Sequence, residues 1–139
     1  MQTIESQIVS KYGPFLERNK FTILRVVVDY EHFGNEVVIC ASSHFHLKIV
    51  KDRGEFLAEI SPGPGKPWYP FEDVLEIALG KKRHKVPLFA RDPIQILDNT
   101  MLWVADAIQS NEAQIAALGQ ARAQKVAEDI FGSRKPSSA

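Results

Sequence analysis

The sequence predicts an α+β fold: an N-terminal helix, a four-stranded antiparallel meander sheet, then a short helix and long C-terminal helices packed on one sheet face. Apolar residues recur at helical spacing near the start of the chain and again after residue 92. Between residues 21 and 60 the period is two, which is typical of strands. The connections in that middle stretch are too short for the crossovers of a parallel sheet, so the strands should form a meander.

Length and composition predict one domain. The chain has 139 residues, of which 45% are apolar and 24% are charged, close to the average for globular proteins. We expect a single domain over residues 1–132 and a disordered tail over residues 133–139.

The first element is an amphipathic helix, expected over residues 3–17. Thr3 suits the capping position, and Gly13–Pro14 predicts a break or kink near the end. The apolar residues that form its buried face are Ile4, Ile8, Val9, Tyr12, Phe15 and Leu16.

Strands follow from residue 21. Leu24, Val26, Val28 and Tyr30 alternate with Arg25, Val27 and Asp29, which predicts a strand with one buried face. Gly34 and Asn35 indicate a turn, and the apolar run Val37–Ala41 favours a central strand covered on both faces.

The third and fourth predicted strands form a hairpin. In the third, Phe45, Leu47 and Ile49 should face the core, opposite His44, His46 and Lys48. Lys51–Gly54 is a compact reversal, so the fourth strand pairs antiparallel with the third. That strand alternates Phe56, Ala58 and Ile60 with Glu55, Leu57 and Glu59.

The second half of the chain is expected to be helical. The proline-rich stretch 61–67 forms an exposed loop and precedes a short helix over residues 70–80 that ends at Gly80. Asp92–Pro93 predicts the start of a long helix, because a capping side chain precedes a proline at the first helical position. A further helix, or a bent continuation, should end near Gly132; Gly119 weakens its middle.

Charge, cysteine usage and hydropathy exclude several classes of function. Lys plus Arg and Asp plus Glu are both 17, a net charge of zero, which argues against a nucleic-acid or anionic-membrane partner. The basic run Lys81–Lys85 is better explained as a solvated connector at a helix C-terminus. Cys40 is the one cysteine, and no signal peptide or membrane span is apparent, so we expect a cytoplasmic protein.

Catalytic and metal-binding signals are weak. His44 and His46 share one strand face, and His32 or Cys40 could join them, but metal sites normally need three or four ligands. Two carboxylates could act as general acid and base, yet charges alternating outward from a strand are ordinary. The candidates are Asp29, Glu31, Glu36, Glu55 and Glu59. We find no nucleotide-binding, nucleophile-elbow or zinc-protease motif, and we expect no cofactor and no catalytic residues.

The sheet half of the chain offers the best candidate for a binding surface. Residues 1–80 carry 11 acidic and 8 basic residues, so this half is modestly acidic. Mixed charges with a few aromatic rings are typical of surfaces that bind another protein. The residues expected to contact a partner are Asp29, Glu31, His44, His46, Lys48, Glu55, Glu59, Trp68 and Tyr69.

Three stretches carry a resemblance to a known family: Gly34–Ile39, Leu47–Gly54, and Trp68–Tyr69 before a short helix. With these, the chain resembles bacterial immunity proteins of polymorphic-toxin and contact-dependent growth inhibition systems. The resemblance rests on a meander and a turn, and it implies a cytoplasmic, non-enzymatic inhibitor. Such an inhibitor binds one cognate toxin domain, often a nuclease, and blocks its active site or an adjacent surface. Many of these inhibitors are acidic, whereas this chain is neutral overall.

Two alternatives remain open from the sequence. One is a small metal-dependent or small-molecule enzyme that uses His44, His46 and a strand carboxylate. The other is a structural or adaptor subunit that dimerises through its C-terminal helices, because an alanine-rich helix packs closely. As an inhibitor, the chain is expected to be a monomer or a weak homodimer.

Overall fold

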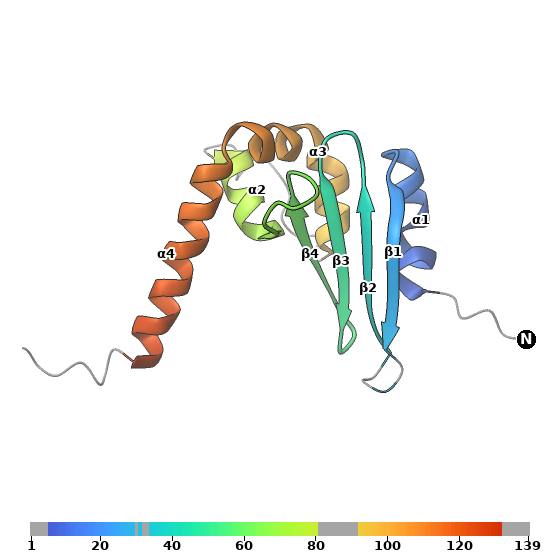
Figure 1. Ribbon diagram of the computed structural model, residues 1–139, viewed down its shortest axis with the longest axis horizontal. Coiled ribbons are helices and arrows are strands. Elements are labelled where there is room, and N and C mark those ends of the chain that lie inside the picture. Colours follow the sequence, from blue (N-terminus) through green and yellow to red (C-terminus); the bar gives the residue numbers. More distant parts are fainter. Residues whose placement is uncertain (1–5, 30, 32–33, 81–91, 132–139) are drawn as a thin grey trace, which may run out of the picture.

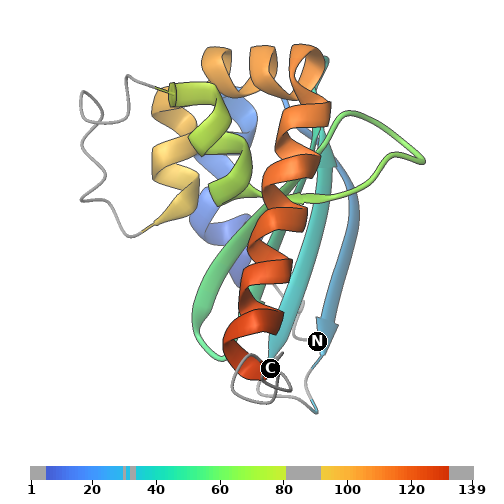
Figure 2. The ribbon, with the colours of Figure 1, turned by 90° about the vertical axis from the view of Figure 1, so that its left-hand side faces the viewer.

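An antiparallel sheet with helices on one face forms the centre of the molecule, as Figures 1 and 2 show. The structure is a computed structural model that describes residues 6–29, 31, 34–80 and 92–131. Its elements are α1 (Gln7–Arg18), β1 (Thr22–Asp29), β2 (Asn35–Ala41), β3 (His46–Asp52), β4 (Glu55–Ser61), β5 (Tyr69–Pro70), α2 (Phe71–Leu79), α3 (Pro93–Ser110) and α4 (Glu112–Phe131). The strands are ordered β1-β2-β3-β4-β5. The predicted α+β meander is confirmed, with the short β5 added to the four expected strands.

One face of the sheet, here called the inner face, packs against α1, α2 and α3. Six apolar side chains of β2 to β4 are buried on this face: Val38, Cys40, Leu47, Ile49, Ala58 and Ile60. Lys51 and Phe56, which pair with each other on the same face, are half-buried. The six buried side chains join Ile8 and Phe15 of α1, Val74 of α2, and Leu97 and Val104 of α3 in one hydrophobic core. The burial of Phe45, Leu47 and Ile49 confirms the alternation that the sequence predicts for β3.

The first helix continues through its proline. Ser6 caps α1, since its hydroxyl accepts a hydrogen bond from the amide of Val9 at 3.2 Å. The break predicted at Gly13–Pro14 is wrong, because α1 runs on to Arg18 with Pro14 inside it. Phe15 and Leu16 directly follow the proline and are buried in the core, and this burial offsets the lost helical hydrogen bond.

Two strand predictions need correction. The expected buried face of β1 is wrong: β1 lies at the edge of the sheet, and Leu24 and Val26 are 55% and 43% exposed. Its register also shifts between Ile23 and Arg25 at a bulge. The expectation that β2 is covered on both faces is wrong too, since alternate residues of β2 are only half-buried. On the second face of the sheet, the side chains of β2 and β3 are half-buried or exposed.

A tight turn joins β3 to β4. Arg53 and Gly54 both have positive φ, at 52° and 83°, as a two-residue type I′ hairpin turn requires. Asn35 of β2 supports the turn, because its side-chain oxygen accepts a hydrogen bond from the amide of Arg53 at 3.0 Å. The compact reversal predicted from the sequence is confirmed, with Asp52 opposite Glu55.

The C-terminal helices begin as predicted. Asp92 caps α3 and accepts a hydrogen bond from the amide of Ile94 at 3.0 Å. The helix bends at Thr100, whose hydroxyl donates to the carbonyl of Ile96 at 2.8 Å. None of the helices within the described ranges is both long and apolar enough to cross a bilayer.

The last helix is anchored over its first half only. Arg122 of α4 pairs with Asp73 and Glu76 of α2, and Asp73 is buried. A glycine suits position 119 because there is little room for a side chain: a Cβ there would lie 3.3 Å from the Asp73 carboxylate. Beyond this anchor, residues 123–130 are exposed, and Figure 1 shows that part of α4 standing away from the sheet.

Several predictions concern residues outside the described ranges. They are the contributions of Ile4, Tyr30 and His32, the basic run Lys81–Lys85, and the tail over residues 133–139. The predicted helix start at residue 3 is wrong, because Ser6 is extended and caps a helix that begins at Gln7.

Candidate functional site

The second face of the sheet, here called the outer face, carries side chains of β1 to β4 that are half-buried or exposed, apart from the buried Ser61. Antiparallel pairing brings its side chains into rows that cross the strands. The row nearest the centre is entirely apolar and consists of Val27, Val37, Val50 and Leu57, one from each of β1 to β4. Val27 and Leu57, at its two ends, are 41% and 45% exposed, and the two central valines are half-buried.

A charged row runs beside the apolar one. It consists of Arg25, Ile39, Lys48 and Glu59 in register. The ammonium of Lys48 lies 3.5 Å from the Glu59 carboxylate and 4.5 Å from the centre of the Trp68 ring. The cation therefore holds the indole ring of Trp68 over the outer face, where its hydrophobic surface is available at low entropic cost.

The two ends of the outer face differ in character. At the end of the β3–β4 turn stand Asp29, Asn35, Asp52 and Glu55, so this end is acidic. At the other end, the loop over residues 62–67 folds onto Ser61, which is buried; the Ser61 hydroxyl lies 3.0 Å from the carbonyl oxygen of Gly63. Figure 2 shows the loop projecting on the side of the outer face.

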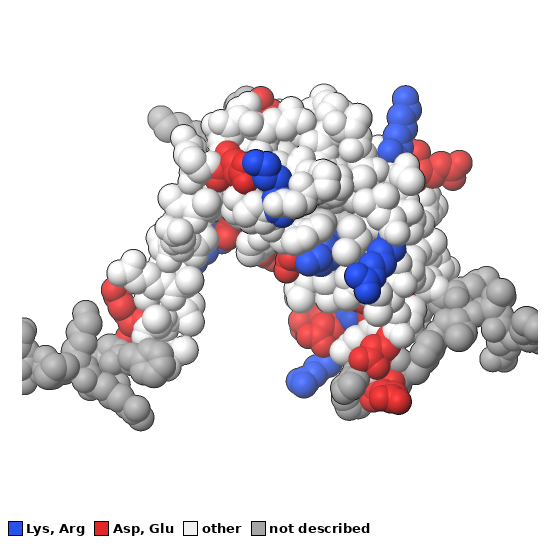
Figure 3. Space-filling model, in the orientation of Figure 1, with Lys and Arg blue, Asp and Glu red and all other residues white. Residues whose placement is uncertain are grey.

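The outer face has the composition of a protein-binding surface. Figure 3 looks onto it and shows broad uncharged areas with basic and acidic groups scattered among them. Burial of an apolar centre contributes favourable free energy to binding. A rim with charges of both signs selects the partner and its orientation.

The structure brings some of the predicted partner-binding residues together and separates others. His46, Lys48, Glu59 and Trp68 share the outer face, with Asp29 and Glu55 at its acidic end. Glu31 and His44 lie in connections rather than strands, both exposed. Tyr69 pairs with the inner-face residue Ile60 and packs against the core, so its ring lies on the helix side of the sheet.

Sequence reasoning missed the centre of this surface. Val27, Val37 and Val50 were assigned to no site, because apolar strand residues are normally buried and β2 was expected to be covered on both faces. Only the pairing register aligns them across the strands. The one available signal was that the outward positions of four successive predicted strands each offer an apolar residue.

Cys40 does not lie near His46, so the two cannot share the metal site considered from the sequence. Cys40 pairs with Leu47 on the inner face, whereas His46 pairs with Ala41 on the outer face, so the two side chains lie on opposite sides of the sheet. Burial raises the pKa of the Cys40 thiol to about 12, which keeps it protonated and unreactive at neutral pH. Within the described ranges, no three or more His, Cys, Asp or Glu side chains form a group that could hold a metal ion.

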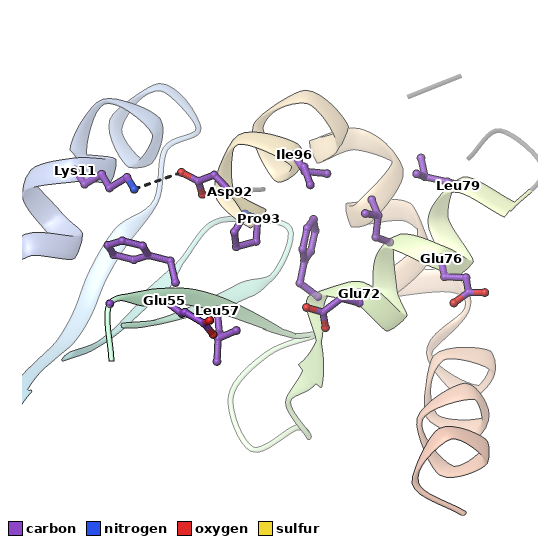
Figure 4. A pocket seen from close by; sticks show the side chains of 13 residues that line it. Lys11, Glu55, Leu57, Glu72, Glu76, Leu79, Asp92, Pro93 and Ile96 are labelled. Atoms are coloured by element: carbon purple, nitrogen blue, oxygen red, sulfur yellow. Dashed lines mark ion pairs between the residues drawn. The ribbon is translucent and has the colours of Figure 1, made fainter. Parts of the chain in front are cut away.

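A cavity of about 680 Å³ lies between α1, β4, α2 and α3, and Leu57, at the end of the apolar row, is one of the residues that line it (Figure 4). Phe56, Phe71 and Leu75 contribute apolar walls, and Glu72 lies at its edge. Neither His44 nor His46 lines it, and Glu55 is the one proposed catalytic carboxylate that does.

Asp92 organises one end of this cavity. Its carboxylate accepts a hydrogen bond from the Tyr12 hydroxyl at 3.0 Å and lies 3.8 Å from the ammonium of Lys11. Burial, and then the adjacent Asp92 carboxylate, raise the pKa of Tyr12 above its usual range. These contacts attach α1 to the start of α3, so their role in the described fold is structural.

Tyr69 connects the short strand β5 to the last helix. Its hydroxyl donates a hydrogen bond to the Glu112 carboxylate at 2.7 Å. Burial, followed by this carboxylate, raises the pKa of Tyr69 to about 12. The contact holds the loop that carries Trp68 against the first turn of α4.

Tyr69→Phe should lower the free energy of unfolding by about 1 kcal/mol at pH 7, because one hydrogen bond to a charged acceptor is lost. The pKa of Tyr69 is higher in the folded protein than in the unfolded chain, so its protonated hydroxyl stabilises the fold. This stabilisation is complete below about pH 10 and is lost as the pH rises towards 12. Urea unfolding of both proteins between about pH 7 and pH 11 checks this, and the difference between them should shrink at alkaline pH. A difference that grows with pH would contradict the assignment.

Comparison with known proteins adds no relative. No protein-family model matches the chain, and no curated protein or solved structure is significantly similar to it. The functional assignment therefore depends on the geometry of the outer face and on the resemblance noted from the sequence.

Proposed function

We propose that this chain is an immunity protein that binds a cognate bacterial toxin domain with its outer face and neutralises it by occluding the active site or an adjacent surface. The proposal places this interaction in the cytoplasm, where a toxin that enters or is made in the cell would act. It requires no catalytic group and no cofactor, only a stable scaffold and a complementary surface.

The observation that carries the proposal is the apolar row of the outer face. Val27, Val37, Val50 and Leu57 lie in register across four strands and are half-buried or exposed. A stable protein complex buries roughly 800 Å² on each partner, and a four-stranded face with an adjoining loop offers surface on that scale. Helices on the inner face keep the platform rigid, so little order must be gained on binding.

The loop and Trp68 support selectivity for one partner. Three prolines between Ser61 and Trp68 restrict the backbone before binding, which lowers the entropic cost of ordering the loop. The Trp68 ring, which follows this loop, packs against the ammonium of Lys48. Tryptophan is enriched among the residues that dominate binding energy in protein complexes.

The charges of the outer face suggest the character of the toxin surface. Lys48 and Arg25 stand beside the apolar row, and an acidic end is formed by Asp29, Asp52 and Glu55. A partner with charges of both signs fits this pattern better than a uniformly basic one. A nuclease partner would then be contacted near, rather than across, its nucleic-acid groove.

Co-expression tests the proposal directly. Cells that produce the toxin domain encoded by the neighbouring open reading frame should survive when this chain is present and die when it is absent. Purified chain should also form a stoichiometric complex with an inactive variant of that toxin domain. Equal killing with and without this chain, together with no complex, would refute the proposed function.

A further inference from the structure

The edge of the sheet at β1 is unusually apolar for a solvent-exposed edge. Ile23, Leu24, Val26 and Val27 are each more than two-fifths exposed, and among the described residues no strand pairs with the free side of β1. An edge strand leaves every second residue with unpaired N–H and C=O groups, and a long apolar edge is normally covered or blocked by charges. The bulge at Leu24 affects only the start of the strand, so Arg25–Asp29 form a regular edge.

We propose that β1 pairs with β1 of a second copy of this chain, antiparallel and centred on Val27, to form one continuous sheet through a homodimer. The inference is independent of the proposed function. It depends on the self-complementarity of the strand and not on the presence of a toxin.

The sequence of the strand matches itself in this register. A two-fold axis at Val27 places Val27 opposite its own copy, and Val26 opposite the second copy's Val28 on the inner face. On the outer face it places Arg25 opposite the second copy's Asp29, and Asp29 opposite the second copy's Arg25. Opposite charges and β-branched residues are favourable cross-strand pairs, so all five opposed positions are complementary. The Asp29 carboxylate also accepts a hydrogen bond from the Glu31 amide at 3.1 Å.

The dimer joins the two apolar rows end to end. Val27 terminates the row on each copy, so the merged outer face carries one apolar row across both sheets. A contact made by one strand on each side buries less than a standard interface, so the association should be weak and concentration-dependent.

Charge reversal tests the register. In an Arg25→Asp dimer, the new aspartate of each copy lies opposite Asp29 of the other copy. In an Asp29→Arg dimer, the new arginine of each copy lies opposite Arg25 of the other copy. Each variant alone therefore has two pairs of like charge and should dimerise at least tenfold more weakly in sedimentation. An equimolar mixture should recover dimers, because both cross-strand pairs are then of opposite charge. The double variant Arg25→Asp with Asp29→Arg should recover them alone. Lys48→Glu, away from the edge, is the matched control and should leave dimerisation unchanged.

Cross-linking tests the same contact without altering charge. Val27→Cys should form a disulfide-linked dimer under mild oxidation, since the two-fold axis brings these side chains together. Leu102→Cys, on the exposed side of α3, is the control and should link far more slowly. A monomer at every concentration, with equal cross-linking at the two positions, would overturn the inference. Protection of the β1 edge that appears only on adding the toxin domain, with the chain monomeric throughout, would also overturn it and assign the edge to a partner strand.

Discussion

Leu57→Lys is expected to weaken binding to the toxin domain by about a hundredfold and to abolish protection in co-expression, because it introduces a charge into the apolar row of the outer face. Leu57 is 45% exposed, so the folded protein should tolerate the lysine. Its large effect on binding arises because the ammonium must lose its water shell when the partner covers the face.

Leu102→Lys provides the matched control. Leu102 is 79% exposed on α3, away from the outer face, and the same change there should leave affinity and protection unchanged. Val50→Lys tests a second position of the row that does not line the cavity, and it should act like Leu57→Lys. Calorimetric titration measures the affinities, and equal effects at Leu57 and Leu102 would contradict the assignment of the binding surface.

Arg122→Ala should lower the free energy of unfolding by about 3 kcal/mol, because it leaves the buried Asp73 carboxylate without its cation. The Asp73 side chain is only 5% exposed, so water cannot replace the guanidinium. Arg122 also pairs with Glu76, so the variant loses both of its ion pairs with α2, while Ile115 keeps the start of α4 in the core.

Arg18→Ala is the control for Arg122→Ala. Arg18 pairs with Asp98 at an exposed position, and its removal should lower stability by less than about 1 kcal/mol. Adding Asp73→Asn to Arg122→Ala should recover part of the lost stability, because the uncompensated charge is then gone. Urea unfolding measures all four proteins, and similar losses from the two arginine variants would show that burial of Asp73 has no energetic importance.

The sequence predicted the arrangement of elements well because each element has its own periodicity and boundary residues. Alternation identified the buried side of β3, and Asp92–Pro93 located the start of α3. The failures have a common cause, which is that local pattern does not report neighbours in space. The proline in α1 is tolerated because Phe15 is buried after it, and β5 is too short to have a period.

The candidate surface was only partly predictable for the same reason. Alternation places His46, Lys48 and Glu59 outward, and the structure places them on one face. The valines that lie between the charges could not be distinguished from core residues, because the sequence does not say which face of an apolar strand a helix will cover. Tyr69 was expected at the same surface but packs on the helix side with its hydroxyl on Glu112.

Methyl NMR of the chain, with and without an inactive variant of the toxin domain, tests the central claim most directly. We predict that the methyl signals of Val37, Val50 and Leu57 shift on binding, while those of Val74 and Leu97, buried on the helix side, keep their positions. Shifts at the cavity residues Leu75 and Leu79, with the outer-face signals unchanged, would show that the partner binds elsewhere and would contradict the account.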